Sequence, residues 1–149
     1  MSNIINSFSG KYHFLSNFHK STIIYNNEQY QTVEHAYQAG KTLDEYERNA
    51  IKLSPTPGIA KKLGKVATIR ADWADIKLFF MAELLSIKFH NIELQYKLLE
   101  TNDSILIEGN THGDTYWGIC RGVGENNLGK LLMALRTEIL KEKNEFITA

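Results

Sequence analysis

The sequence predicts a mostly helical α+β fold with a small antiparallel sheet. Amphipathic helical patterns recur from residue 30 toward the end of the chain. The sheet is indicated by Asn26 and Asn27, which tolerate left-handed conformations and separate two strand-like stretches at 22–25 and 28–30. With 149 residues, 43% of them apolar, the chain is long enough for one substantial core. We therefore expect a single compact domain over residues 1–149.

The boundaries of each element are predicted from capping and helix-breaking residues. The alternating aromatic and polar residues of 10–18 predict a strand that leads into a tight turn. Thr32 is a candidate N-cap for a helix that Gly40 could end. Further helices are expected at 44–53, 56–64, 73–89, 91–99 and from 127 through 139, and short strands at 66–69 and 105–107. Two apolar stripes on 73–89 predict a helix at the centre of the core, capped by Asp72.

Composition excludes several classes of protein. Seventeen basic and seventeen acidic residues leave no net charge, which argues against a general binder of nucleic acid or membrane surfaces, but not against a local phosphate pocket. No targeting segment or membrane span is recognisable, so we expect a cytoplasmic protein without membrane contact. Cys120 is the single cysteine and reads more readily as a small buried residue than as a nucleophile. No metal site or cofactor is expected.

The stretch 30–41 carries the most informative polar pattern. Glu34, Gln38 and Lys41 share one face of the predicted helix, whereas Val33 and Tyr37 point elsewhere. Such a face is either solvated or part of a site, and the helix by itself does not distinguish the two.

Three carboxylates follow features that could hold them in place. Glu34 is near a helix start, Glu108 at a strand end, and Asp114 in the glycine-rich stretch 109–127. Trp73 and Trp117 could form flat walls for a planar heterocycle, although both could equally be core residues.

These groups suit cleavage of a glycosidic bond. The reaction needs an acid for the leaving group and a carboxylate for the developing oxocarbenium ion or the attacking water, roles that Glu34 and Asp114 could divide. Lys41 offers a second route, because a desolvated amine can form a Schiff base with an opened sugar. Candidate phosphate ligands are Lys65, Arg70 and Arg121.

An ordered series of motifs over about residues 8–140 resembles the YbiA-like, or NADAR, family. The matching words are FLSNF at 14–18, TVEHAYQ at 32–38 with Lys41, TP at 56–57, RADW at 70–73, KF at 88–89, EGN at 108–110, DTYWG at 114–118 and NLGKLLM at 127–133. Members of the family usually have the sequence Trp-Gly-x-Gly where this chain has Trp117-Gly118-Ile119-Cys120. We therefore expect the loop after the tryptophan to differ in shape from that of other members.

The resemblance implies a compact α+β domain with N-glycosidase activity. One branch of the family hydrolyses phosphoribosylated aminopyrimidines, intermediates of riboflavin biosynthesis; another removes ADP-ribose from guanine, including guanine in nucleic acid. Glu34 and Asp114 carry over as catalytic residues from the first branch, and Lys41 from the second. The substrate-binding residues that it implies are Asn17, Phe18, Gln38, Arg70, Trp73, Glu108, Trp117 and Gly118. A non-catalytic module that binds ADP-ribose or a nucleotide is the remaining alternative.

Overall fold

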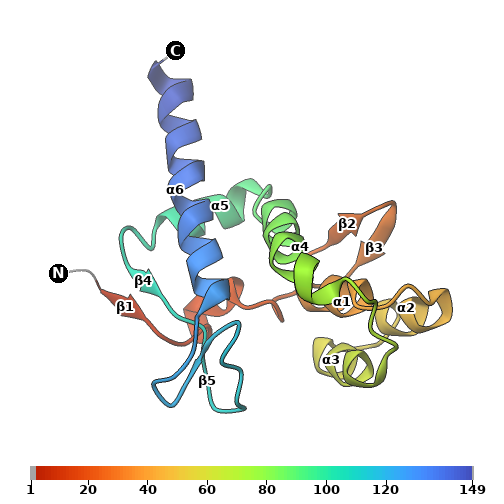
Figure 1. The fold of residues 1–149 in the computed structure, drawn as a ribbon. Helices are drawn as coiled ribbons and strands as arrows, with labels where there is room; N and C mark the ends of the chain where they lie inside the picture. The colour runs from red at the N-terminus through yellow and green to blue at the C-terminus, as the bar shows by residue number, and fades with distance from the viewer. Residues whose placement is uncertain (1–2, 149) are drawn as a thin grey trace. The chain divides into compact units, whose positions relative to one another are not determined.

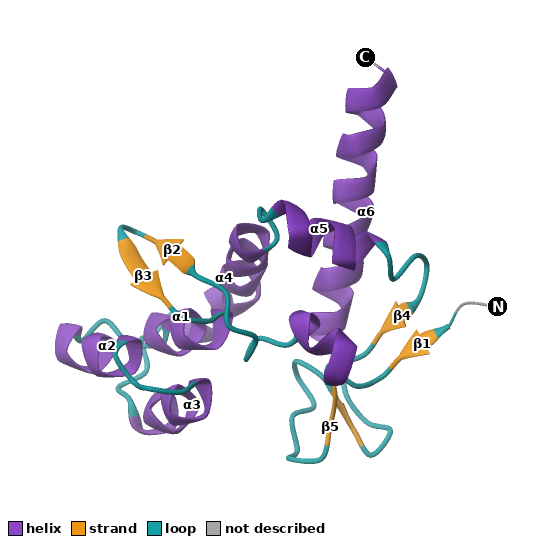
Figure 2. Ribbon diagram, turned by 180° about the vertical axis from the view of Figure 1, so that it is seen from behind, coloured by secondary structure: helices purple, strands orange, loops and turns teal. Residues whose placement is uncertain are grey.

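The computed structural model describes residues 3–148, which divide into two compact units. One unit is Asn17–Lys88, and the other combines the described parts of Met1–Ser16 and Phe89–Ala149. Helices dominate both units and the strands are short, as Figures 1 and 2 show. The mostly helical α+β prediction is confirmed. The single domain over 1–149 stays a prediction.

The unit Asn17–Lys88 consists of a hairpin followed by helices. Strands β2 (Ile23–Tyr25) and β3 (Glu28–Tyr30) are antiparallel, with Ile23 opposite Tyr30. Asn26 and Asn27 form the turn with φ of 50° and 64°, as predicted. The helices are α1 (Val33–Gly40), α2 (Glu45–Lys52), α3 (Pro57–Val66) and α4 (Trp73–Lys88).

The second unit is built around α6 (Asn127–Thr148). Its other elements are β1 (Ile4–Ile5), the 3₁₀ helix η1 (Gly10–Leu15), α5 (Ile92–Leu99), β4 (Ile105–Leu106), β5 (Gly109–Asn110) and β6 (Ile119–Cys120). The pairs β1–β4 and β5–β6 are parallel. Buried Leu98, Leu106, Leu128 and Leu132 belong to its core. The predicted helix start at Asn91 is confirmed, because its side chain caps α5.

Two predicted strands are wrong. Residues 10–15 form η1, with hydrogen bonds from Tyr12 N to Ser9 O and from Ser16 N to His13 O. The aromatic alternation misled because Phe14 and Leu15, adjacent in sequence, are both buried. Residues 66–69 form no strand either: α3 continues to Val66, and Ile69 is 54% exposed.

Helix α4 is less enclosed than predicted. Phe80, Met81, Leu84 and Leu85 are buried, whereas Phe79 is 75% exposed. The helix therefore presents part of its expected apolar surface to solvent. Within residues 3–148, no helix is long and apolar enough to cross a membrane.

Candidate active site

Helix α1 is anchored at its first turn by a buried histidine. The hydroxyl of Thr32 accepts a hydrogen bond from the backbone N–H of His35 at 3.0 Å. It also lies 2.8 Å from Nδ1 of the His35 imidazole ring. Nε2 of His35 lies 3.0 Å from the carbonyl oxygen of Ser54, which can only accept, so Nε2 donates this hydrogen bond. This pairing fixes where α1 begins and what its first turn presents.

Glu34 is held within α1 by the side chain of Gln38. Its carboxylate is buried, and Gln38 Nε2 donates to Glu34 Oε2 at 2.6 Å. The other end of the Gln38 amide faces Gly64 of α3, where a Cβ atom would collide with Gln38 Oε1. The glycine at 64 thus does not end α3 as predicted; it leaves room for the Gln38 amide. Of this polar face, Glu34 and Gln38 are buried and Lys41 is half-buried.

Lys41 directly follows α1 and is half-buried. Its ammonium lies 5.7 Å from the centre of the Tyr37 ring. Burial lowers the pKa of Lys41 from 10.5; the charge of Glu34 opposes this, and Lys61, Lys77 and Lys65 add to the lowering. A larger fraction of the Lys41 side chains is therefore unprotonated near neutral pH than for an exposed lysine.

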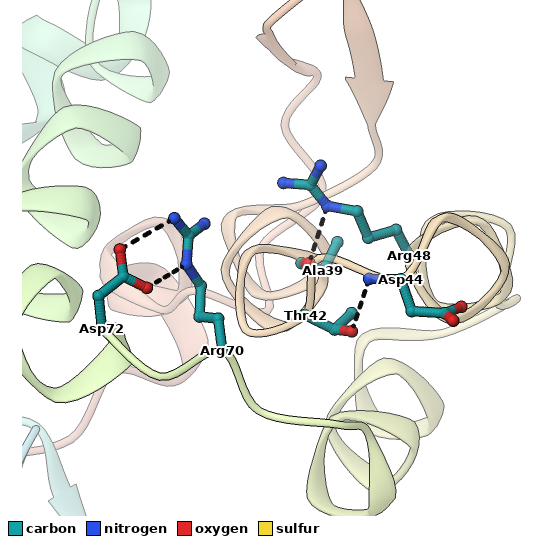
Figure 3. Close-up of polar contacts among 6 residues, drawn as sticks. All are labelled: Ala39, Thr42, Asp44, Arg48, Arg70 and Asp72. Carbon is teal, nitrogen blue, oxygen red and sulfur yellow. Dashed lines mark hydrogen bonds and ion pairs between the residues drawn. The ribbon is translucent and has the colours of Figure 1, made fainter.

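Arg70 and Trp73 lie in the segment that leads into α4. Arg70 N donates to the Lys41 carbonyl at 2.7 Å, and its guanidinium forms two hydrogen bonds with Asp72, at 2.6 and 3.1 Å (Figure 3). The carboxylate predicted to cap α4 is thus paired with arginine. Trp73 is 7% exposed and packs between two aromatic rings. The centroid of its ring lies 5.1 Å from that of Tyr37 and 6.0 Å from that of Phe80.

Asn17 connects the start of this unit to Glu34. Its carbonyl oxygen accepts from Glu34 N at 3.1 Å, and its side-chain nitrogen lies 3.6 Å from the sulfur of Met81. Asn17 is buried, and no hydrogen bond reaches its Oδ1 within the described chain. Phe18, the next residue, is 38% exposed. The side-chain oxygen of Gln38 is a second buried acceptor for which no hydrogen bond is found among the described residues.

Asp114 shapes the loop of the other unit. Its Oδ1 accepts from the backbone N–H groups of Tyr116 at 3.1 Å and Trp117 at 2.8 Å. The rings of Tyr116 and Trp117 then meet edge to face, with centroids 4.7 Å apart. Asn127 at the start of α6 donates to Tyr116 O at 3.0 Å, which ties the loop to the helix. Trp117 is half-buried, so part of its ring is accessible.

Glu108 approaches the same loop from β4. Asn110 Nδ2 donates to Glu108 Oε2 at 3.1 Å and to the Asp114 carbonyl at 2.9 Å. A side chain at Gly118 would collide with Glu108, so only glycine lets the carboxylate lie this close. Asn110 was not among the site residues expected from sequence, although an asparagine between Glu108 and Asp114 in a glycine-rich loop was a usable signal.

Two further candidates lie at the end of this loop. Cys120 is buried in β6, and its backbone pairs with Val123 through hydrogen bonds of 2.9 and 3.1 Å. Arg121 is exposed in the intervening turn with φ of 53°. The structure thus gathers Asn17, Glu34, Gln38, Lys41, Arg70 and Trp73 in one unit, and Glu108, Asp114, Trp117 and Gly118 in the other. That the two sets meet in one pocket stays a prediction.

Comparison with known proteins gives consistent matches over nearly the whole chain. A model of the NADAR domain matches residues 6–140. N-glycosidase YbiA of Escherichia coli (strain K12) is 38% identical over 141 residues, covering 92% of this chain and 88% of that protein. The maize riboflavin biosynthesis protein PYRR, chloroplastic, is 38% identical over 123 residues, covering 73% of this chain and 20% of that protein.

The fold is equally similar to a solved structure. The NMR structure of E. coli YbiA matches with a TM-score of 0.84 and 35% identity, covering 97% of this chain and 90% of that one. Fold and relatives together define the class of protein, a hydrolase of N-glycosidic bonds. The chain belongs to the NADAR family.

Proposed function

We propose that the enzyme hydrolyses the N-glycosidic bond of a phosphoribosylamino-pyrimidine, an intermediate of riboflavin biosynthesis. The observation that carries the proposal is the grouping of a buried, amide-held carboxylate at Glu34 and a half-buried amine at Lys41 around one short helix. The similarity to a maize protein named for riboflavin biosynthesis supports the choice of pyrimidine.

Lys41 would act as the nucleophile. The substrate is a glycosylamine, so its sugar ring opens to an imine at C1, which the free amine of Lys41 attacks. The bond from C1 to the pyrimidine amine breaks and that amine leaves with a proton. Water then hydrolyses the Lys41 imine, releasing ribose 5-phosphate and regenerating the amine. The lowered pKa of Lys41 supports this role, because more of the side chain is unprotonated near neutral pH.

Glu34 and Asp114 would move the protons. Gln38 positions the carboxyl group of Glu34, which in its protonated form would give a proton to the departing amine and, as the resulting carboxylate, would then take a proton from the attacking water. One oxygen of Asp114 is engaged by the backbone of its loop, so its second oxygen would face the substrate. If Lys41 does not form an imine, the same two carboxylates would support direct attack by water.

The remaining candidates would bind substrate. In this proposal, Trp117 stacks on the pyrimidine and Arg70 binds the phosphate. Trp73 packs behind Tyr37 and contributes to the pocket wall from the core. The other proposed contacts are Asn17, Phe18, Gln38, Glu108 and Gly118.

The test is incubation with 5-amino-6-(5-phosphoribosylamino)uracil, with free ribose 5-phosphate as the readout. Borohydride added during turnover should attach the sugar covalently to the wild type but not to Lys41→Ala. Lys62→Ala is the matched control, because Lys62 is exposed on α3. This variant should be labelled to the same extent as the wild type. No release of ribose 5-phosphate under conditions where a YbiA relative is active would rule out this substrate. Activity without labelling would favour direct attack by water.

A second substrate is favoured by the same lysine. ADP-ribosylated guanine, free or in nucleic acid, also carries its base on C1 of a ribose that can open. An amine with a lowered pKa at position 41 suits this reaction equally. Release of ADP-ribose from a modified guanosine, with no release from the pyrimidine, would select this alternative.

A further inference from the structure

A pocket of about 370 Å³ lies in the unit Asn17–Lys88, at the end of α1. Gly40, at the end of α1, lines it together with the hairpin residues Tyr25 and Asn26. Gly40 packs against Phe80 of α4, whereas Gln38 packs against Gly64 of α3. The pocket volume is within the range of small-molecule sites.

Two arginines, Arg48 and Arg70, line the pocket together with the carboxylate of Glu83. The guanidinium of Arg70 is already paired with Asp72, so Arg48 is the arginine that can receive a ligand. Nε of Arg48 donates to the Ala39 carbonyl at 3.4 Å, and no hydrogen bond occupies its two terminal nitrogens within residues 3–148. Figure 3 shows these nitrogens projecting away from the backbone of α1. Guanidinium groups placed this way suit a phosphate oxygen.

The segment that carries Arg70 is held firmly. Thr68 N donates to both carboxylate oxygens of Glu47, at 2.9 and 3.2 Å, and Glu47 also accepts from the Thr42 hydroxyl at 3.1 Å. Arg70 N adds the hydrogen bond to Lys41 O. Since Glu47 precedes Arg48 on α2, the same residues fix both sides of the pocket before any ligand arrives.

The pocket also has an uncovered aromatic wall. Phe79 lines it and is 75% exposed, although it belongs to an otherwise well-packed helix. Beside it, Phe80 is fixed edge-on by Tyr25 at 5.1 Å. A planar ring placed on Phe79 would remove exposed apolar area from water and gain stacking energy.

We infer that this pocket binds a sugar phosphate that also carries a planar heterocycle. Arg48 is the main phosphate ligand and Phe79 is the stacking surface. The inference is independent of which substrate the enzyme hydrolyses. The phosphorylated ring belongs either to the substrate or to a separate nucleotide.

The test is binding of AMP, ribose 5-phosphate and adenosine to the full-length protein, followed by amide NMR. AMP should bind more tightly than either fragment and shift the resonances of Tyr25, Asn26 and Gly40. Arg48→Gln should weaken the binding of both AMP and ribose 5-phosphate about tenfold or more. Phe79→Ala should weaken the binding of AMP about fivefold or more and leave the affinity for ribose 5-phosphate unchanged.

Controls separate binding from folding. Lys62→Gln removes an exposed charge on α3 outside the pocket and should change none of the affinities. Because Phe79 is exposed, its replacement tests the pocket even if loss of the Arg48–Ala39 hydrogen bond disturbs α1. Equal binding of AMP and adenosine, or unchanged AMP binding in both Arg48→Gln and Phe79→Ala, would overturn the inference.

Inhibition kinetics then identify the source of the ligand. If AMP competes with the hydrolysed substrate and Arg48→Gln raises KM, the pocket holds the phosphate of the substrate. If AMP binds and KM is unchanged, it holds a separate nucleotide.

Discussion

Glu34 and Asp114 are both candidate catalytic carboxylates, but the protein holds them in different ways. Glu34 is fixed by another side chain, because Gln38 donates to one of its oxygens from the next turn of the same helix. Asp114 is fixed by the backbone, because Tyr116 and Trp117 donate their N–H groups to one oxygen. We therefore expect a replacement of Glu34 to change chemistry without unfolding the helix, whereas removal of the side-chain oxygen of Asp114 should also affect the shape of its loop.

The largest expected effect distinguishes chemistry from folding. Glu34→Gln and Asp114→Asn should each lower turnover by about 10²–10⁴, because each removes an acid–base group. Both should leave the melting temperature nearly unchanged, since asparagine at 114 still offers a side-chain oxygen to the loop. Steady-state kinetics and circular dichroism measure the two effects. Wild-type rates in both variants would refute the catalytic assignment.

A second comparison tests how Glu34 is held. In Gly64→Ala, the new Cβ would collide with the Gln38 amide, which must move and lose its alignment with Glu34. We expect turnover to fall about 10–10²-fold. Gly58→Ala is the control in the same helix, because the nearest atom to its Cβ would be the Thr56 hydroxyl at 3.9 Å. Equal rates in the two variants would show that Gln38 does not position Glu34.

Asp114→Ala should affect stability where Asp114→Asn does not. Alanine removes the acceptor for two backbone N–H groups of the loop, at a cost of about 1–2 kcal/mol. Urea unfolding of the two variants measures this difference, and Trp117 fluorescence should change only in the alanine variant. The same stability in both would mean that the loop keeps its shape without Asp114.

The smallest effect concerns the charge around Lys41. The charge of Lys61 contributes to lowering the Lys41 pKa, so Lys61→Gln should raise that pKa. The pH of half-maximal borohydride labelling should therefore shift upward. Lys62→Gln should not shift it, because Lys62 is not among the charges that act on Lys41. An equal shift in the two variants would indicate general loss of charge.

Local signals were sufficient for most helices. Thr32, Asp44, Thr56 and Asn91 each cap the helix that follows, because short polar side chains accept from exposed N–H groups at helix starts. The turn at Asn26 and Asn27 was also correctly predicted from the sequence. By contrast, the strand at 66–69 was misassigned, because apolar residues that remain exposed give the same pattern as a buried strand.

Contacts between distant residues could not be read from the sequence. Gly64 was interpreted as a helix end, and only its proximity to Gln38 shows the use of its missing side chain. Arg48 gave no signal, because its role depends on a pocket formed by the hairpin, α1 and α4. Lys41 was selected from helical spacing, but the lysines around it come from other helices.

Lys88, the last residue of α4, couples folding to proton release. Its side chain is 1% exposed, and burial lowers its pKa to about 7. Between that value and the 10.5 of an unfolded lysine, the unfolded chain holds a proton that the folded chain has lost, so stability should increase as pH rises through this range. Urea midpoints measured from pH 7 to 9.5 should climb in the wild type and flatten in Lys88→Met. The end of α4 would thus make alkaline conditions favourable to the folded state.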